Sequence, residues 1–218
     1  DDRPFQWVEN EYMTQDEYDE ILKDPIGFTV KKLWPRVATT LTPISDAAKI
    51  EPPLLPFLSN AYTLPDFLGN LISQPSVTES LEKLLALAQE IKTINSIASE
   101  HEREMKRLGY PLIFGAMTYP AFDWISDTLR GLRGTSLDMY QVPDKLLALI
   151  DMFVPLTIQG VIGGAEESGI KRAFIPLHRG AGGFMSNEQF ARFYWPGLKT
   201  LILGLIDAGI TPVPLFEG

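Results

Sequence analysis

The chain has 218 residues, of which 45% are hydrophobic and 22% charged, a composition typical of a soluble globular protein of about one domain. Its formal net charge of −9 argues against a nucleic-acid partner, because phosphate binding needs concentrated Lys and Arg. No apolar run approaches the roughly 18 residues of a membrane span, so we expect no membrane partner. The sequence has no cysteine, which excludes disulfides and thiolate metal sites within it and favours a cytoplasmic location.

The two ends of the sequence suggest a piece of a longer protein. The chain begins at Asp1 without a Met and ends at Gly218, directly after a predicted strand. We therefore expect a segment that is truncated at both ends.

Residues 1–109 are predicted to be mostly helical. Thr14–Glu17 has the pattern of a capping box, in which a hydroxyl and an acid three residues later satisfy each other's backbone amides. Pro25 is expected to begin a second helix. Ser76–Glu79 predicts another capping box, which opens a long helix with apolar residues at helical spacing. Gly109 is expected to end that helix.

Residues 110–218 alternate between short apolar runs and long helical patterns. This alternation is typical of βαβ units and a parallel sheet. Ligands of parallel α/β folds bind beyond the carboxyl ends of the strands, so the polar residues that follow each run are candidates for chemistry. The predicted strands are 112–117, 172–177 and 210–216.

Two helices are predicted between these strands. The first begins at Pro143 and is expected to be bent or broken at Pro155 and loosened by Gly163 and Gly164. The second is capped by Ser186–Gln189 and must kink at Pro196.

His178 is the strongest single candidate for chemistry. It follows a predicted strand and precedes a Gly-rich turn, where a His can be a general acid or base, a metal ligand or a donor to an anion. A structural role, in which His178 hydrogen-bonds the neighbouring backbone, stays open. The other His, His101, lies among charged residues of a predicted helix and is expected on the surface.

Other polar residues near the strand ends are weaker candidates. Glu217, at the end of the last strand, can contact a ligand or a metal. Asp123 and Asp127 share one helical face after Tyr119, and structural roles are favoured for both, with Asp123 as a helix cap. Gly180–Gly183 can present backbone N–H groups to an anion, or can simply form a tight connection.

From Tyr110 to Gly218 the order of features resembles the uroporphyrinogen decarboxylase superfamily. Residues 1–109 match more loosely, through an acidic entry segment. The most specific segment is Ser186–Lys199, because that family has a capped helix in which aromatic residues precede a Pro. The segments that carry the resemblance are Pro111–Ala116, Arg130–Gly134, Tyr140–Leu147, His178–Gly183 and Ser186–Lys199.

The resemblance implies an α/β fold, a (β/α)8 TIM barrel that is partial in this chain, with an amino-terminal helical region. Residues 1–109 and 110–218 would then be two parts of one barrel domain with a deep pocket at the strand carboxyl ends. A complete barrel takes about 250 residues. At that pocket we expect His178 and Glu217 in catalysis and Tyr119, Asp123, Arg179, Gly180 and Phe216 against the substrate.

The superfamily includes methyltransferases, and the favoured function is transfer of a methyl group between a small methylated donor and a corrinoid (cobalamin) protein. Members of that branch often carry His-x-Cys-Gly where this chain has Leu215-Phe216-Glu217-Gly218. The departure argues against a thiolate zinc site, although Glu217 can still serve as an oxygen ligand.

The alternative function is decarboxylation of uroporphyrinogen III in tetrapyrrole biosynthesis, which would need no cofactor. Decarboxylases carry an amino-terminal Met-Arg-Gln-Ala-Gly-Arg-Tyr segment, which would lie before Asp1. Basic residues must neutralise the acidic tetrapyrrole, and the visible candidates are Arg130, Arg133, Arg172 and Arg179. A third possibility is a barrel that binds a tetrapyrrole or a partner without turning it over.

Overall fold

The computed structural model describes residues 10–47, 60 and 62–216. These residues group into two compact units, which are considered separately below. One unit contains the described residues up to Lys23 together with those from Leu112 onward, and the other contains the described residues from Asp24 to Pro111.

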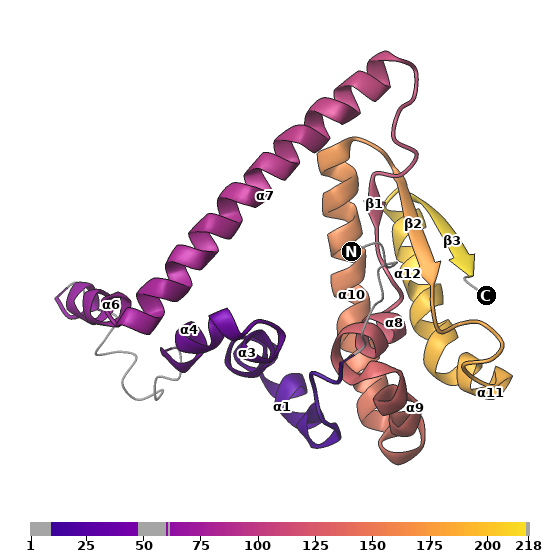
Figure 1. The fold of residues 1–218 in the computed structure, drawn as a ribbon. Helices are drawn as coiled ribbons and strands as arrows, with labels where there is room; N and C mark the ends of the chain where they lie inside the picture. The colour runs from indigo at the N-terminus through magenta and orange to yellow at the C-terminus, as the bar shows by residue number, and fades with distance from the viewer. Residues whose placement is uncertain (1–9, 48–59, 61, 217–218) are drawn as a thin grey trace, which may run out of the picture. The chain divides into compact units, whose positions relative to one another are not determined.

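A three-stranded parallel sheet forms the centre of the first unit (Figure 1). Its strands are β1 (Ala116–Met117), β2 (Arg172–Leu177) and β3 (Thr211–Phe216), in the order β1-β2-β3. Ala116 pairs with Ala173, and Leu177 at the end of β2 pairs with Phe216 at the end of β3. The three predicted strands are therefore confirmed as adjacent and parallel, although β1 is shorter than expected.

The predicted (β/α)8 barrel is wrong for the part of the chain that the structure describes. Its one sheet has three strands, and most of the remaining residues are helical. Closing a small barrel needs about eight tilted strands, so a sheet of three strands stays open. The described residues from Asp24 to Pro111 form helices and add no strand to this sheet.

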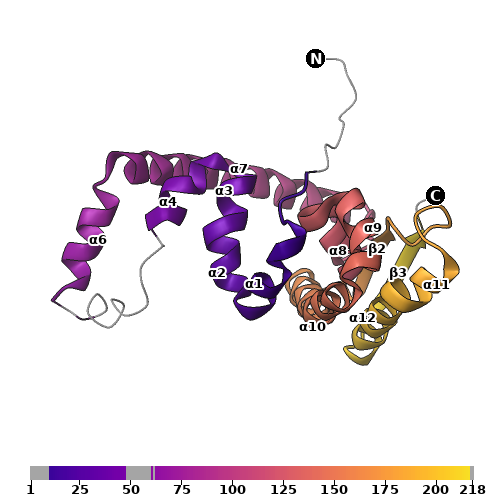
Figure 2. The same ribbon diagram turned by 90° about the horizontal axis from the view of Figure 1, so that it is seen from below.

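Helices connect successive strands and pack against the sheet. α10 (Pro143–Ser168) and α12 (Trp195–Asp207) pack against each other (Figure 2). α10 also packs against β1 and β2, and α12 packs against β3. Their fully buried side chains form the core with those of β2, chiefly Leu146, Leu149, Ile150, Val161, Ile175, Leu177, Leu198, Leu201 and Leu205. The connecting elements are α8 (Ala121–Ile125), η5 (Ser126–Arg130), α9 (Gly131–Gln141) and α10 (Pro143–Ser168), then α11 (Asn187–Gln189), η6 (Phe190–Tyr194) and α12 (Trp195–Asp207).

α10 begins at Pro143 as predicted, and it is not broken at Pro155, where the sequence predicted a bend or a break. The helix continues to Ser168 and is followed by Gly169, which has the left-handed φ of +70°. Proline removes one backbone hydrogen bond, and burial of one face of α10 outweighs that loss. By length and composition alone α10 also suits a membrane span, a property it shares with the core helices of soluble proteins.

The start of the last helix is confirmed. The Ser186 hydroxyl accepts a hydrogen bond from the Gln189 N–H at 3.2 Å, and the Ser186 N–H donates to the Gln189 side chain at 2.9 Å. A π-helical turn, η6, then precedes Pro196. In it Trp195 N–H donates to the Phe190 carbonyl five residues earlier.

A buried polar network attaches the amino-terminal residues of this unit. Thr14 N–H donates to the Glu17 carboxylate at 2.9 Å, which forms the acidic half of the predicted capping box. After the short η1 (Gln15–Glu17), α1 (Tyr18–Lys23) packs against α10. Asp138 accepts hydrogen bonds from Tyr18 Oη at 2.8 Å and from Arg130 Nε at 2.6 Å.

The second unit is helical. Asp24 accepts a hydrogen bond from Gly27 N–H at 2.9 Å, so the helix predicted at Pro25 is confirmed. The second capping box is wrong, because the long helix already begins at Pro75 and Ser76 lies inside its first turn. The elements are α2 (Pro25–Phe28), η2 (Thr29–Leu33), α3 (Trp34–Val37), η3 (Thr39–Leu41), α4 (Thr42–Ala47), α6 (Leu64–Ile72) and α7 (Pro75–Arg107).

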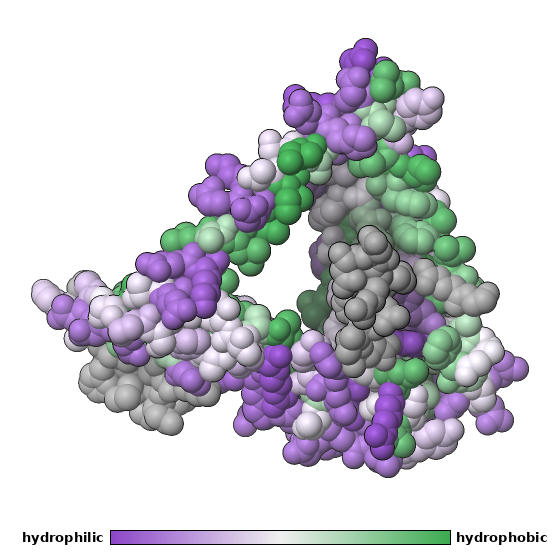
Figure 3. Space-filling view, viewed as in Figure 1, coloured by the Kyte–Doolittle hydropathy of each residue, from purple (hydrophilic) through white to green (hydrophobic). Residues whose placement is uncertain are grey.

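α7 exposes most of its length. Val77 and Ser80, both near its start, are its buried residues. Beyond them a row of apolar side chains that includes Leu87, Ile91 and Ile94 is exposed, and Figure 3 shows such side chains along the helix.

Candidate functional site

His178 lies directly after β2 and forms a close pair with an acid. Its Nδ1 is 2.6 Å from Asp127 Oδ2, and the other oxygen of Asp127 accepts from Arg179 Nη2 at 2.9 Å. The side chain of His178 is 29% exposed and that of Asp127 is 14% exposed. The imidazole is therefore within reach of a ligand, while its acidic partner is shielded from water.

A second acid, Asp123, holds the backbone of the same segment. Its carboxylate accepts hydrogen bonds from His178 N–H at 2.9 Å and Arg179 N–H at 3.2 Å. It also accepts from Tyr194 Oη at 2.7 Å. Asp123 is fully buried within α8, so its predicted role as a helix cap is wrong.

Two π-helical turns carry residues of this cluster. Asp127 lies in η5, and Tyr194 lies at the end of η6. A π turn inserts one extra residue into a helix and so changes the direction of the side chains that follow. Such turns recur at functional sites.

Burial changes the proton affinity of the two central groups. It raises the pKa of Asp123 to about 6, against the opposing effect of the hydrogen bonds from Tyr194 and from the His178 N–H. Burial and the neighbouring charge of Asp123 raise the pKa of Tyr194, so its hydroxyl stays protonated and acts as a donor.

Aromatic rings and a glycine complete the surroundings of His178. The ring centroid of Tyr119 is 4.7 Å from that of His178. At Gly180 a Cβ atom would come within 2.9 Å of the Tyr194 ring and 3.1 Å of the Phe216 ring. This close approach requires glycine, so the turn after β2 rests directly on two aromatic side chains.

The structure brings most of the predicted site residues together. Tyr119, Asp123, His178, Arg179, Gly180 and Phe216 all belong to this cluster at the carboxyl end of the sheet. Glu217, the other candidate for catalysis and for metal binding, lies outside the described residues. His101 is exposed on α7, as expected.

Sequence reasoning assigned no site role to Asp127, Ser126 or Tyr194. Ser126 Oγ accepts a hydrogen bond from Arg179 Nε at 3.1 Å. The spacing of Asp123 and Asp127 was a usable signal, because acids four residues apart face the same neighbour. Nothing local to the sequence marks Tyr194, whose partner is 71 residues away.

The arrangement suits proton transfer. With Asp127 accepting at Nδ1, that nitrogen carries the proton of the neutral imidazole, and the carboxylate holds the ring in a fixed orientation, as a general acid or base requires. Among residues 10–47, 60 and 62–216, no three His, Asp or Glu side chains gather as metal ligands.

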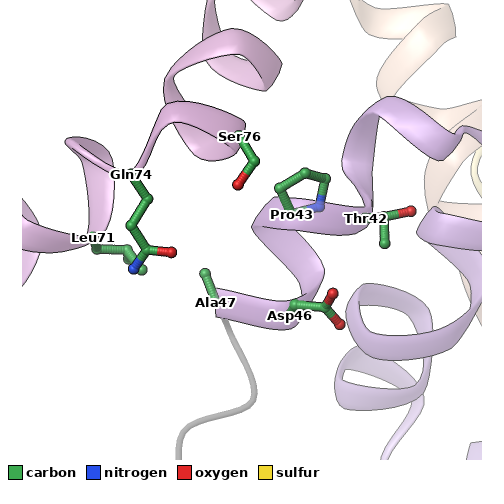
Figure 4. A pocket seen from close by; sticks show the side chains of 7 residues that line it. All are labelled: Thr42, Pro43, Asp46, Ala47, Leu71, Gln74 and Ser76. Carbon is green, nitrogen blue, oxygen red and sulfur yellow. The ribbon is translucent and has the colours of Figure 1, made fainter.

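A hollow lies in the other unit, where α4, α6 and the start of α7 meet (Figure 4). Its volume is about 590 Å³, and Asp46 is the one ionisable side chain among the described lining residues. The described lining residues include no His. The lining residues are Thr42, Pro43, Asp46, Ala47, Leu71, Gln74 and Ser76.

Comparison with protein-family models, with curated proteins and with solved structures gave no match to this chain.

Proposed function

We propose that this chain is part of an enzyme in which the pair formed by Asp127 and His178 transfers a proton to or from a bound substrate. The observation that carries the proposal is the contact of 2.6 Å between His178 Nδ1 and Asp127 Oδ2 beside a partly exposed imidazole. A carboxylate at Nδ1 orients the ring and stabilises its protonated form, as general acids and bases require.

The reaction that we propose is methyl transfer between a small methylated donor and a corrinoid protein, in a cytoplasmic enzyme. This choice rests on the resemblance of residues 110–218 to the uroporphyrinogen decarboxylase superfamily. In that reaction the bond between the methyl carbon and the donor heteroatom breaks, the methyl group passes to the corrinoid, and the heteroatom keeps the electron pair. In its doubly protonated form His178 would give one proton to that heteroatom, which makes it a better leaving group, and would keep the proton that Asp127 accepts.

The arginines are the reason to prefer this reaction to porphyrinogen decarboxylation. Arg130 is 3% exposed and ion-paired with Asp138, and Arg179 is ion-paired with Asp127. Arg172 donates through Nε to the Ile113 carbonyl at 2.7 Å. Three of the four arginines that a porphyrinogen decarboxylase would need for its acidic substrate thus already bind other groups of this protein.

The test is an assay of the purified protein with cob(I)alamin and a panel of methanol, methylamines, methyl thioethers and methoxylated aromatics. We expect methylation of the corrinoid with at least one donor. His178→Gln should lower the turnover at least about a hundredfold, as is usual on removal of a general acid or base.

His101→Gln is the matched control, because the chain has two His residues and His101 is exposed on α7. It should leave the turnover unchanged. Lack of methyl transfer with every donor would reject the proposed reaction. Full activity of a folded His178→Gln protein would reject the proposed role of the pair.

A further inference from the structure

We infer that Asp123 is a positioning residue, which holds the peptide of His178 and Arg179 so that the imidazole meets Asp127 through Nδ1. This inference rests on the proposed role of the Asp127–His178 pair. The carboxylate of Asp123 is fully buried and takes no part in the proposed proton transfer. By holding the peptide, it fixes which nitrogen of His178 carries the proton.

Asp123 and Asp127 bind different parts of the two residues that follow β2, His178 and Arg179. Asp123 takes both backbone N–H groups, at 2.9 Å from His178 and 3.2 Å from Arg179. Asp127, one helical turn later, takes both side chains, at 2.6 Å from His178 Nδ1 and 2.9 Å from Arg179 Nη2. One helix segment thereby fixes the backbone and the side chains of this short loop together.

The backbone contact matters because β2 ends at Leu177, before these residues. The N–H groups of His178 and Arg179 therefore lie beyond the ladder between β2 and β3, whose last pair is Leu177 with Phe216. Without Asp123 these N–H groups would lose the hydrogen bonds that fix their peptides, and the imidazole would be held against Asp127 less firmly.

Tyr194 orients Asp123 in turn. Its hydroxyl donates to Asp123 Oδ2 at 2.7 Å from the end of η6, and its ring supports Gly180 in the same loop. Asp123 therefore links α8, the loop after β2 and η6. The groups that face it are Tyr194, the backbone N–H groups of His178 and Arg179, and the charges of Asp127 and His178.

The experiment is ¹⁵N NMR of the imidazoles in the whole chain, above the pH at which they are protonated. The His101→Gln background leaves the signals of His178 alone. We expect the His178 signals of the tautomer that is protonated at Nδ1. In Asp123→Asn they should move toward a mixture of the two tautomers.

Tyr194→Phe is a graded comparison. It removes one donor to Asp123 but keeps the hydrogen bonds from the His178 and Arg179 N–H groups, so the His178 signals should move less than they do in Asp123→Asn. Unchanged His178 signals in a folded Asp123→Asn protein would overturn the inference.

A second measurement needs no variant at Asp123. Backbone hydrogen exchange of His178 and Arg179 should be as slow in the wild-type protein as that of residues inside β2, although both residues lie beyond the strand. Fast exchange at both positions would overturn the inference even if Asp123→Asn failed to fold. An inactive assay of the wild-type protein would reject the proposed reaction and leave these spectra unaffected.

Discussion

The buried acids Asp123 and Asp138 of the first unit differ in the donors that they receive. Asp138 has a cationic partner, because Arg130 Nε donates to it at 2.6 Å. The hydrogen bonds to Asp123 come from neutral groups, two backbone N–H groups and the hydroxyl of Tyr194. A buried negative charge without a hydrogen-bonded cation is costly, which explains the raised pKa of Asp123.

The raised pKa predicts how Asp123 affects stability as the pH changes. Its pKa rises from 3.8 to about 6 in the folded protein, so between these values the native state holds a proton that the unfolded state has lost. The contribution of Asp123 to stability is therefore greatest below about pH 4 and falls as the pH rises through 6. The fall amounts to about 3 kcal/mol by proton linkage.

Urea unfolding of the wild type and of Asp123→Asn at several values from pH 4 to pH 7 measures this effect. The free energy of unfolding of the wild type, minus that of the variant, should decrease across the range. The subtraction removes contributions from other titrating groups. A difference that rises with pH would contradict the pKa of Asp123.

At the scale of single elements, α10 shows how the same residue type can have opposite effects at neighbouring positions. A Cβ atom at Gly163 would meet nothing within 4 Å, whereas one at Gly164 would lie 3.2 Å from the Cβ of Ala116 in β1. The helix therefore needs a small residue at Gly164, where it crosses the sheet, and does not need one at Gly163.

Alanine substitutions test this difference. Gly163→Ala should stabilise the protein by about 0.5–1 kcal/mol, because alanine costs less backbone entropy in a helix than glycine. Gly164→Ala has the same entropic benefit, but its methyl group would press against Ala116 of β1. This variant should therefore be at least about 1 kcal/mol less stable than Gly163→Ala. Equal unfolding midpoints for the two variants would show that α10 and β1 are not in close contact.

At the scale of the whole molecule, burial is uneven. α10 buries residues along most of its length, from Leu146 to Ala165, whereas the buried residues of α7 are Val77 and Ser80 near its start. Helical stability in proteins comes mainly from packing of an apolar face rather than from intrinsic propensity. The two long helices should therefore differ in how readily they open.

Hydrogen exchange followed by mass spectrometry can compare them. Peptides from residues 82–107 should exchange faster, by at least about tenfold, than peptides from residues 146–165, because local opening costs least where few side chains are buried. Equal protection of both segments would mean that the apolar row of α7 is covered in solution.

Several parts of the structure could be predicted from the sequence because their causes are local. Alternating apolar runs and helical patterns located the three strands, and Gly109 and Gly209, with φ of +90° and +73°, end their helices through backbone freedom alone. The cap at Ser186 depends on Gln189, three residues later. The position of the strand ends likewise marked His178 and Tyr119 as neighbours.

The sequence by itself thus determined which segments form strands and helices and which side chains follow the strands, since these depend on residues a few positions apart. The tertiary structure decided the number of strands in the sheet, the passage of α10 through Pro155, and the roles of Asp123, Asp127 and Tyr194. Each of these depends on partners about 40 or more residues away, and burial among those partners outweighs local preference.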